Sequence, residues 1–282
     1  MATVEPMEIG LVIWAEDGAQ ATLNRVSEFG LRVIQLGIPP AVDCTTAVAD
    51  WKQALSGSSV VITSAVCCYT GEDYSTVATV HESVGFTSPK YRAERIARTK
   101  EIAAFAHAFG IKAVSCHIGF IPADATDPLY AELLDVAQTI CDAVAEYGQN
   151  FVLETGQESA AVLLKFIADS KRTNLKINFD PANMILHGSG DPLQALELVQ
   201  KHVLSVHCKD GRSPVPGSGL LGKECRLGDG EVDFPGFLAL LKKIGYRGPL
   251  TIEREEEDQV QKSKDIHTAI ARLQEWKKQL SL

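Results

Sequence analysis

The sequence predicts an α/β protein with the fold of a (β/α)8 TIM barrel. Short apolar, β-branched runs alternate with longer helical patterns along the whole chain. Eight such runs are present, and they are almost continuously apolar, as expected of parallel strands covered on both faces. No Ser/Gly-rich linker or shift in composition divides the chain, so we expect one domain over residues 1–282. A doubly wound open sheet is the alternative, but eight strands without a G-x-G-x-x-G motif favour the barrel.

The predicted strands, in order, cover residues 8–14, 31–37, 59–67, 112–119, 150–156, 175–180, 204–210 and 249–255. The clearest helical patterns between them cover residues 88–110, 127–148, 191–202 and 233–246. Two of these open on Asp-Pro and one on Ser-Pro, which are helix start signals, and glycines end the first two. The segments 69–88 and 211–232 are predicted long loops that each follow a strand. We expect them to line a substrate pocket.

Composition limits the classes of function. The formal net charge is −9 and the pI is about 5.3, which disfavours non-specific binding to nucleic acids. The seven cysteines are odd in number and form no C-x-x-C pair, as is typical of a reduced compartment. The N-terminal residues do not form a signal-peptide pattern, and no apolar run approaches the ~20 residues of a membrane span. We therefore expect a cytoplasmic protein without membrane partners.

Ionisable side chains end four consecutive predicted strands, the fifth to the eighth: Glu154, Asp180, His207 and Glu253. In a TIM barrel the carboxyl ends of all strands open onto one face, so these groups should converge there. Three carboxylates in such a pocket repel one another, by about 4 kcal/mol for a pair at about 4 Å and an effective dielectric near 20. Protonation, Lys or Arg partners, or a divalent metal ion could offset this repulsion, and the added imidazole favours the metal.

Each of these residues alone has an ordinary structural explanation. A strand-end glutamate often forms a loop ion pair, Asp180 before Pro181 could cap the next turn, and His207 could be a satisfied buried histidine. The acidic run 253–258 reads as a solvated loop apart from Glu253. The joint pattern on consecutive strands favours the metal site. Three oxygens and one nitrogen suit Mn²⁺, with Co²⁺, Mg²⁺ or Zn²⁺ as alternatives.

The motifs "VLETG", "NFDPANM", "VHCKD" and "TIERE", in this order and at barrel spacing, resemble the xylose isomerase-like TIM-barrel superfamily. They are most similar to its sugar (phosphate) isomerase/epimerase branch. "HIGF" at 117–120 and "LGDGEVDFPGF" at 227–237 also look like segments of this family. The resemblance implies that the four strand-end residues are metal ligands. It further implies that Glu154 and Glu253 act as the acid-base pair.

The resemblance also suggests substrate contacts. Glu158 matches a position that contacts substrate in epimerase relatives, and Asn183 stands where several relatives have a histidine. That departure weakens a close match to the ketose 3-epimerases, and it also counts against the endonuclease IV branch with its additional histidines. Lys209 follows His207 by two residues and should point the same way.

Other residues at the predicted mouth have competing explanations. Trp14 ends the first predicted strand and should form a pocket wall. His117 ends the fourth, where it could bind substrate or pack as an ordinary strand-end histidine. Arg226 lies in a glycine-rich loop, where it could bind substrate or pair with an acid. No phosphate-binding glycine pattern is visible after the seventh strand, so an uncharged substrate is expected.

Together these observations predict a metal-dependent isomerase or epimerase. Its substrate would be a sugar, cyclitol or small hydroxy-keto compound, and proton transfer would pass through a metal-bound enediolate. A dehydratase (lyase) acting on a related keto-polyol is the alternative, since the same intermediate can lose a β-hydroxyl. An endonuclease IV-like phosphodiesterase is less favoured, because it needs a basic face and more zinc ligands. The expected partner is a carbohydrate-like small molecule, not nucleic acid, and a homo-oligomer is an open alternative to a monomer.

Overall fold

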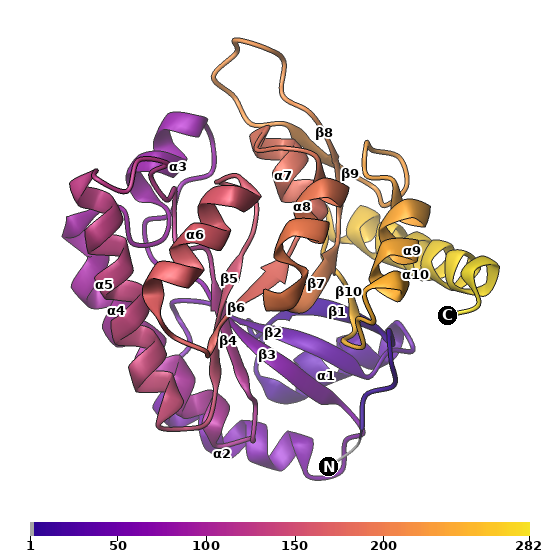
Figure 1. Ribbon diagram of the computed structural model, residues 1–282. Helices are drawn as coiled ribbons and strands as arrows, with labels where there is room; N and C mark the ends of the chain where they lie inside the picture. Colours follow the sequence, from indigo (N-terminus) through magenta and orange to yellow (C-terminus); the bar gives the residue numbers. More distant parts are fainter. Residues whose placement is uncertain (1–2) are drawn as a thin grey trace.

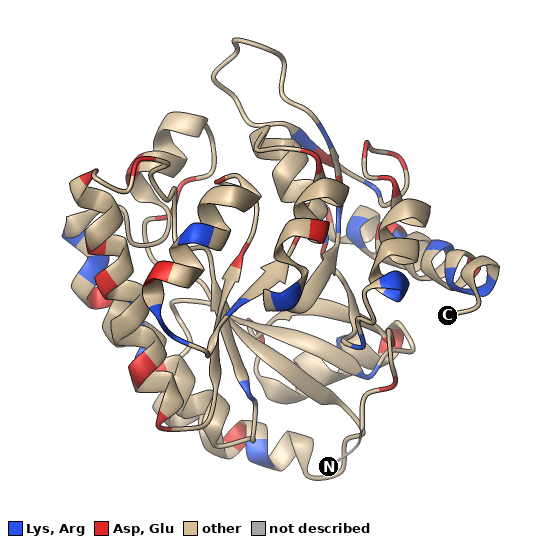
Figure 2. Ribbon diagram, viewed as in Figure 1, with Lys and Arg blue, Asp and Glu red and all other residues tan. Residues whose placement is uncertain are grey.

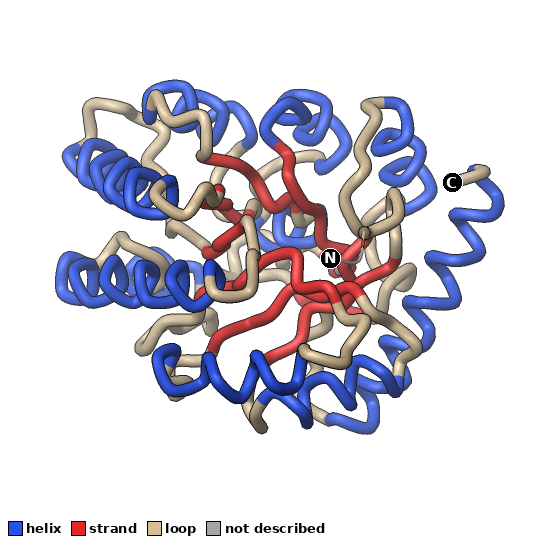
Figure 3. The backbone as a smooth tube through the Cα atoms, turned by 90° about the horizontal axis from the view of Figure 1, so that it is seen from below, coloured by secondary structure: helices blue, strands red, loops and turns tan. Residues whose placement is uncertain are grey.

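The computed structural model describes residues 3–282, and it is a closed barrel of eight parallel strands surrounded by helices (Figures 1 and 3). Around the barrel the strand order is β1-β10-β7-β6-β5-β4-β3-β2. The strands are β1 (Ile9–Trp14), β2 (Val33–Ile38), β3 (Val61–Cys67), β4 (Ala113–Cys116), β5 (Asn150–Glu154), β6 (Leu175–Phe179), β7 (Val203–Cys208) and β10 (Leu250–Ile252). The pairing of β1 with β10, Ile9 opposite Leu250, closes the ring. The predicted TIM barrel is confirmed.

All eight predicted strands are present, with ends that differ by a few residues. The largest differences are at the fourth strand, which was predicted to reach residue 119 but ends at Cys116, and at the last strand, which was predicted to reach residue 255 but ends at Ile252. Only residues 250–252 pair with both β1 and β7, and the chain leaves the barrel ladder directly afterwards. Glu253 therefore stands at the lip of the barrel rather than inside the sheet.

The outer layer consists of α-helices that follow the strands. They are α1 (Ala19–Glu28), α2 (Cys44–Leu55), α3 (Val77–Ser83), α4 (Pro89–His107), α5 (Pro128–Ala145), α6 (Ala160–Ser170), α7 (Pro181–His187), α8 (Pro192–Val199), α9 (Phe234–Lys243) and α10 (Gln259–Leu280), and a 3₁₀ turn η1 (Gln200–His202) follows α8. None of the described helices is both long and apolar enough to cross a bilayer.

The Asp-Pro signals act as predicted. The Asp127 side chain accepts a hydrogen bond from Leu129 N–H at the start of α5, and Asp191 does the same for Gln194 N–H at the start of α8. In both helices proline occupies the first turn, where its missing N–H costs nothing. The helices pack their apolar faces onto the strands to form one continuous core.

The two segments predicted as long loops contain regular structure. Residues 69–88 include the helix α3, which opens with a capping box between Thr76 and Thr79. Residues 211–232 include most of an antiparallel hairpin of β8 (Asp210–Arg212) and β9 (Lys223–Cys225), whose connection rises above the barrel mouth (Figure 1). Such short elements carry little periodic signal, so their sequences read as irregular.

Candidate metal centre

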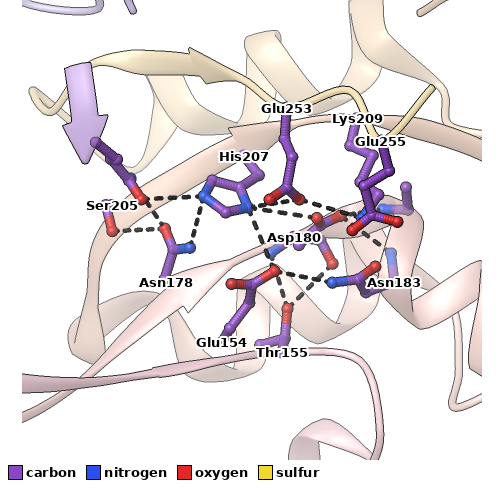
Figure 4. Close-up of polar contacts among 12 residues, drawn as sticks. Glu154, Thr155, Asn178, Asp180, Asn183, Ser205, His207, Lys209, Glu253 and Glu255 are labelled. Carbon is purple, nitrogen blue, oxygen red and sulfur yellow. Dashed lines mark hydrogen bonds and ion pairs between the residues drawn. The ribbon is translucent and has the colours of Figure 1, made fainter. Parts of the chain in front are cut away.

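The four strand-end side chains meet at the mouth of the barrel. Glu154, Asp180, His207 and Glu253 each offer one ligand atom, and these atoms lie within 4.8 Å of one another. The His207 Nδ1 atom lies 3.2 Å from Glu253 Oε2, 3.4 Å from Glu154 Oε1 and 3.5 Å from Asp180 Oδ2 (Figure 4). The sequence-based expectation that these residues converge is therefore met in the structure.

Asp180 combines two roles that the sequence left as alternatives. Its Oδ1 atom caps α7 by accepting hydrogen bonds from Ala182 N–H at 2.8 Å and Asn183 N–H at 3.0 Å. The hydroxyl of Thr155 fixes the Asp180 backbone on both sides, accepting from its N–H and donating to its C=O. Capping uses only one carboxylate oxygen. The other, Oδ2, is buried without a hydrogen-bond partner among the described residues and faces His207.

His207 is held from below by a layer of polar side chains inside the barrel. Its Nε2 atom lies 3.1 Å from the acceptor Gln35 Oε1 and 2.9 Å from Asn178 Nδ2, and the Asn178 Oδ1 atom accepts a hydrogen bond from the Ser205 hydroxyl. A proton on Nε2 can be donated to Gln35 Oε1. The Nδ1 lone pair then points into the space between the carboxylates, as a metal-binding histidine requires.

The two glutamates have different neighbours. Glu154 Oε1 accepts a hydrogen bond from the Asn183 amide at 2.9 Å and lies 3.5 Å from His117 Nε2. The close approach of Asn183 requires a glycine at 156, because a Cβ there would lie 2.4 Å from the Asn183 Cβ. Glu253 Oε2 instead accepts from Lys209 Nζ at 3.1 Å. Each glutamate has one carboxylate oxygen, Oε2 of Glu154 and Oε1 of Glu253, that forms no hydrogen bond or ion pair with the described residues.

Charge and burial oppose each other at this site. Burial acts to raise the pKa of Glu154 and Glu253, but His117 and His207 outweigh it at Glu154, and Lys209 and His207 hold the Glu253 pKa well below its usual value. Burial raises the Asp180 pKa. Burial disfavours a charged imidazole, yet the two glutamates raise the His207 pKa well above its ordinary value. The carboxylates of this site therefore strongly stabilise a positive charge placed among them.

The donor set fits a divalent cation. Two buried atoms that face each other, Asp180 Oδ2 and His207 Nδ1, have no hydrogen-bond partner among the described residues. Buried polar atoms are usually satisfied, so an unsatisfied pair suggests an additional binding partner. Three carboxylates and one imidazole suit Mn²⁺, Mg²⁺, Co²⁺ or Zn²⁺. The four residues could thus hold one such ion.

A cavity of about 620 Å³ opens above the four-residue cluster. Four residues that the sequence suggested for substrate binding line it: Trp14, His117, Asn183 and Lys209. Two others do not line it. Glu158 is buried, and this burial raises the pKa of its carboxyl group to about 8. The Arg226 guanidinium pairs with the Asp229 carboxylate at 2.6 Å.

Sequence reasoning missed several residues of the site. Glu255 is exposed, as expected of the solvated run, but it also lines the cavity and accepts a hydrogen bond from Lys209 Nζ at 2.8 Å. Its spacing of two from Glu253 was the available signal, because alternate residues of an extended chain share a side. Gln35 and Asn178 were also missed. Each is a polar residue within a largely apolar strand, β2 for Gln35 and β6 for Asn178, and this pattern could have indicated a polar contact inside the barrel.

Similar proteins agree with this architecture. A xylose isomerase domain protein from Planctomyces limnophilus has a crystal structure that matches with a TM-score of 0.92 and 38% identity, over 98% of this chain and 99% of that one. A D-allulose 3-epimerase from Methylomonas sp. matches with a TM-score of 0.70 and 20% identity, over 98% and 100%, which shows a shared fold. An L-ribulose 3-epimerase from Methylomonas sp. is 30% identical over 153 residues, 50% of this chain and 47% of that protein.

The alignments with curated relatives cover only 27% to 54% of the length of those proteins. The family model covers far more of this chain. The model for the xylose isomerase-like TIM barrel matches residues 23–279, a range that includes all four residues of the cluster and most of the barrel. This protein belongs to the xylose isomerase-like TIM-barrel family.

Proposed function

We propose that this protein is a metal-dependent isomerase or epimerase that moves a proton on a sugar, a cyclitol or a small hydroxy-keto compound. The observation that carries the proposal is the convergence of three carboxylates and the His207 Nδ1 atom at the floor of a cavity. The similarity to an L-ribulose 3-epimerase over half of the chain supports the carbohydrate-like substrate.

The proposed cofactor is one divalent ion, Mn²⁺ in the first place, with Co²⁺, Mg²⁺ and Zn²⁺ as alternatives. Glu154, Asp180, His207 and Glu253 would hold it. An ion of this kind polarises a ketone carbonyl and acidifies the neighbouring C–H bond.

Glu154 and Glu253 are proposed as the two bases. They stand on β5 and directly after β10, and β6 and β7 separate these strands in the barrel, so the two carboxylates reach the cavity from different sides. Their pKa values are lowered, which keeps both in the ionised form that a base requires, at the cost of lower basicity. One can take the proton from one face of a carbon, and the other can return a proton to the opposite face. Epimerisation requires two such groups.

Trp14, His117, Asn183 and Lys209 are the proposed substrate contacts, since all four line the cavity. Among its described lining residues, Lys209 is the one Lys or Arg, and it is already paired with Glu253 and Glu255. A phosphate group would therefore find no unpaired guanidinium or ammonium group there. This supports an uncharged substrate.

The test replaces each base by its amide. Glu154→Gln and Glu253→Gln keep the shape and one carbonyl oxygen, but the amide cannot accept a proton. We expect each to lower turnover by about 10² to 10⁴ at saturating Mn²⁺, with metal content measured separately. Glu257→Gln is the matched control, because Glu257 is exposed in the same acidic run. In heavy water the wild type should place deuterium on the carbon beside the carbonyl.

Three results would contradict or redirect the proposal. Wild-type turnover by both amide variants with metal bound would exclude the two-carboxylate mechanism. Product without solvent deuterium would point to internal transfer or a hydride shift. Loss of water in the product mass would identify the dehydratase instead.

A further inference from the structure

The cavity above the four-residue cluster is larger than a simple sugar needs. At water's share of about 30 Å³ per non-hydrogen atom, an upper bound for a bonded molecule, the roughly twelve such atoms of a hexose fill less than about 360 Å³. The cavity holds about 620 Å³. Ligand sites usually enclose most of the ligand that they bind. A second part of the substrate is therefore expected in the remaining space.

The lining of the cavity has a polar part, here called the floor, and an apolar part contributed by several elements, here called the apolar side. The floor carries Glu154, Glu253 and their polar neighbours, whereas the apolar lining consists of Trp14, Val66, Tyr74, Leu186, Leu220 and Leu221. A sugar hydroxyl placed against such side chains loses its water without gaining a partner, at a cost of about 1–3 kcal/mol. The apolar side suits a group without hydroxyls.

Two exposed side chains mark the outer end of the apolar side. Tyr74 is 43% exposed and Leu220 is 54% exposed, although both are large and line the cavity. The Tyr74 ring lies 5.9 Å from the His117 ring, and His117 lies beside Glu154, so this end is about two side chains from the metal centre. A large apolar group left open at a pocket rim is a common sign of a binding contact.

The hairpin connection carries Leu220 to this rim. Residues 213–222, "SPVPGSGLLG", contain no charged residue, and Figure 2 shows the projecting loop without Lys, Arg, Asp or Glu. The Val77 N–H at the start of α3 donates a hydrogen bond of 3.2 Å to the Gly219 carbonyl. This contact joins the loop tip to the opposite wall, next to the segment that bears Tyr74. The apolar rim is thus assembled from two separate segments.

We propose, building on the proposed function, that the substrate is a hydroxy-ketone joined to an apolar substituent about the size of an aromatic ring. A keto-sugar with an aromatic or alkyl aglycone is such a molecule. Its ketone end meets the metal centre, and its apolar end lies against Tyr74 and Leu220.

Two synthetic probes test this without assuming a sugar configuration. The compounds 1-hydroxy-3-benzyloxypropan-2-one and 1-hydroxy-3-methoxypropan-2-one have no stereocentre and differ only in the apolar end. Binding to the Mn²⁺-loaded protein is measured by calorimetry. We expect the benzyl ether to bind about tenfold more tightly or better, since even one methylene in an apolar pocket is worth roughly that factor.

Three variants locate the effect. Tyr74→Ser and Leu220→Ser should each reduce the benzyl-to-methyl affinity ratio several-fold. Val215→Ser is the matched control, because Val215 is 73% exposed in the same loop and does not line the cavity. All three positions are exposed, so thermal melting should show an unchanged fold.

Equal affinity for the two probes in the wild type, or no binding of the benzyl ether, would overturn the inference. The placement of the apolar group against Tyr74 and Leu220 would be wrong in two cases. In the first, both rim variants leave the benzyl-to-methyl affinity ratio unchanged, and in the second, Val215→Ser lowers this ratio equally. Deuterium exchange into dihydroxyacetone reports separately on the proposed proton transfer. Deuterium exchange without tighter binding of the benzyl ether would contradict only the proposed apolar substituent. Tighter binding of the benzyl ether without deuterium exchange would contradict the proposed proton transfer.

Discussion

The mouth of the barrel has two walls that both fall in segments predicted from sequence as long loops, but they differ in how they are held. One is the β3–α4 segment, residues 68–88. From the neighbouring helix α4, the Arg95 guanidinium, only 2% exposed, donates to the carbonyls of Thr70 at 2.9 Å and Ser83 at 2.6 Å, and to that of Gly85. The Glu72 carboxylate adds bonds from the N–H groups of Tyr69 and Gly85. These bonds fasten this wall at both of its ends.

The other wall is the β8–β9 hairpin, residues 210–225. Its base is firm, because the Asp210 carboxylate accepts from the N–H groups of Gly228, Gly230 and Val232, and Glu224 pairs with Arg254 at 3.0 Å. Its tip is different. The tip is joined to the opposite wall by a backbone hydrogen bond from the Val77 N–H to the Gly219 carbonyl. The comparison indicates a fixed wall facing a wall with a movable tip, as closing loops over active sites require.

The largest expected effect comes from releasing the fixed wall. Arg95→Met keeps the packing of the stem but leaves three carbonyls without their charged donor. We expect the free energy of unfolding to fall by about 2–4 kcal/mol, measured by urea denaturation. Lys100→Met, exposed on the same helix, is the control. An equal loss in both variants would mean that the guanidinium does not hold the wall.

A smaller, pH-dependent effect is expected at the base of the hairpin. Burial, the largest influence, raises the Glu224 pKa from its usual 4.5 to about 7. Between these values the folded state binds more protons than the unfolded state, so the contribution of Glu224 to stability falls as pH rises from about 4.5 to 7. Glu224→Gln should remove this dependence. Its stability relative to the wild type should rise by about 1–3 kcal/mol between pH 5 and pH 8.

Unfolding curves at several pH values check this prediction. A constant difference between Glu224→Gln and the wild type from pH 5 to pH 8 would show that the ion pair with Arg254 keeps the Glu224 pKa near its usual value.

The smallest effect concerns the tip itself. A broad-specificity protease should cut within residues 213–222 at least about tenfold faster than within 69–88, because a difference in local opening of about 1.4 kcal/mol gives that factor. The benzyl ether probe should slow cutting at the tip. Mass spectrometry of the first fragments locates the cuts. Comparable cutting of both walls would show that they are equally mobile.

The sequence predicted much of the fold because the relevant signals are local. Strand periodicity and the Asp-Pro caps depend on neighbouring residues, so all eight strands and the four named helices could be located. The placement of Glu154, Asp180, His207 and Glu253 followed from one rule, that parallel strands of a barrel end on one face. Each of these residues stands at or beside a strand end, so small errors in strand boundaries did not matter.

The tertiary structure alone decided what depends on distant contacts. Closure of the barrel, with Ile9 paired to Leu250, brings the last strand beside the first, and the pairing of β10 with β7 brings Glu255 beside Lys209. Arg95 likewise holds a segment up to 25 residues earlier in the chain. Such contacts join residues that are far apart in sequence. Their geometry depends on the whole path of the chain, which local periodicity does not encode.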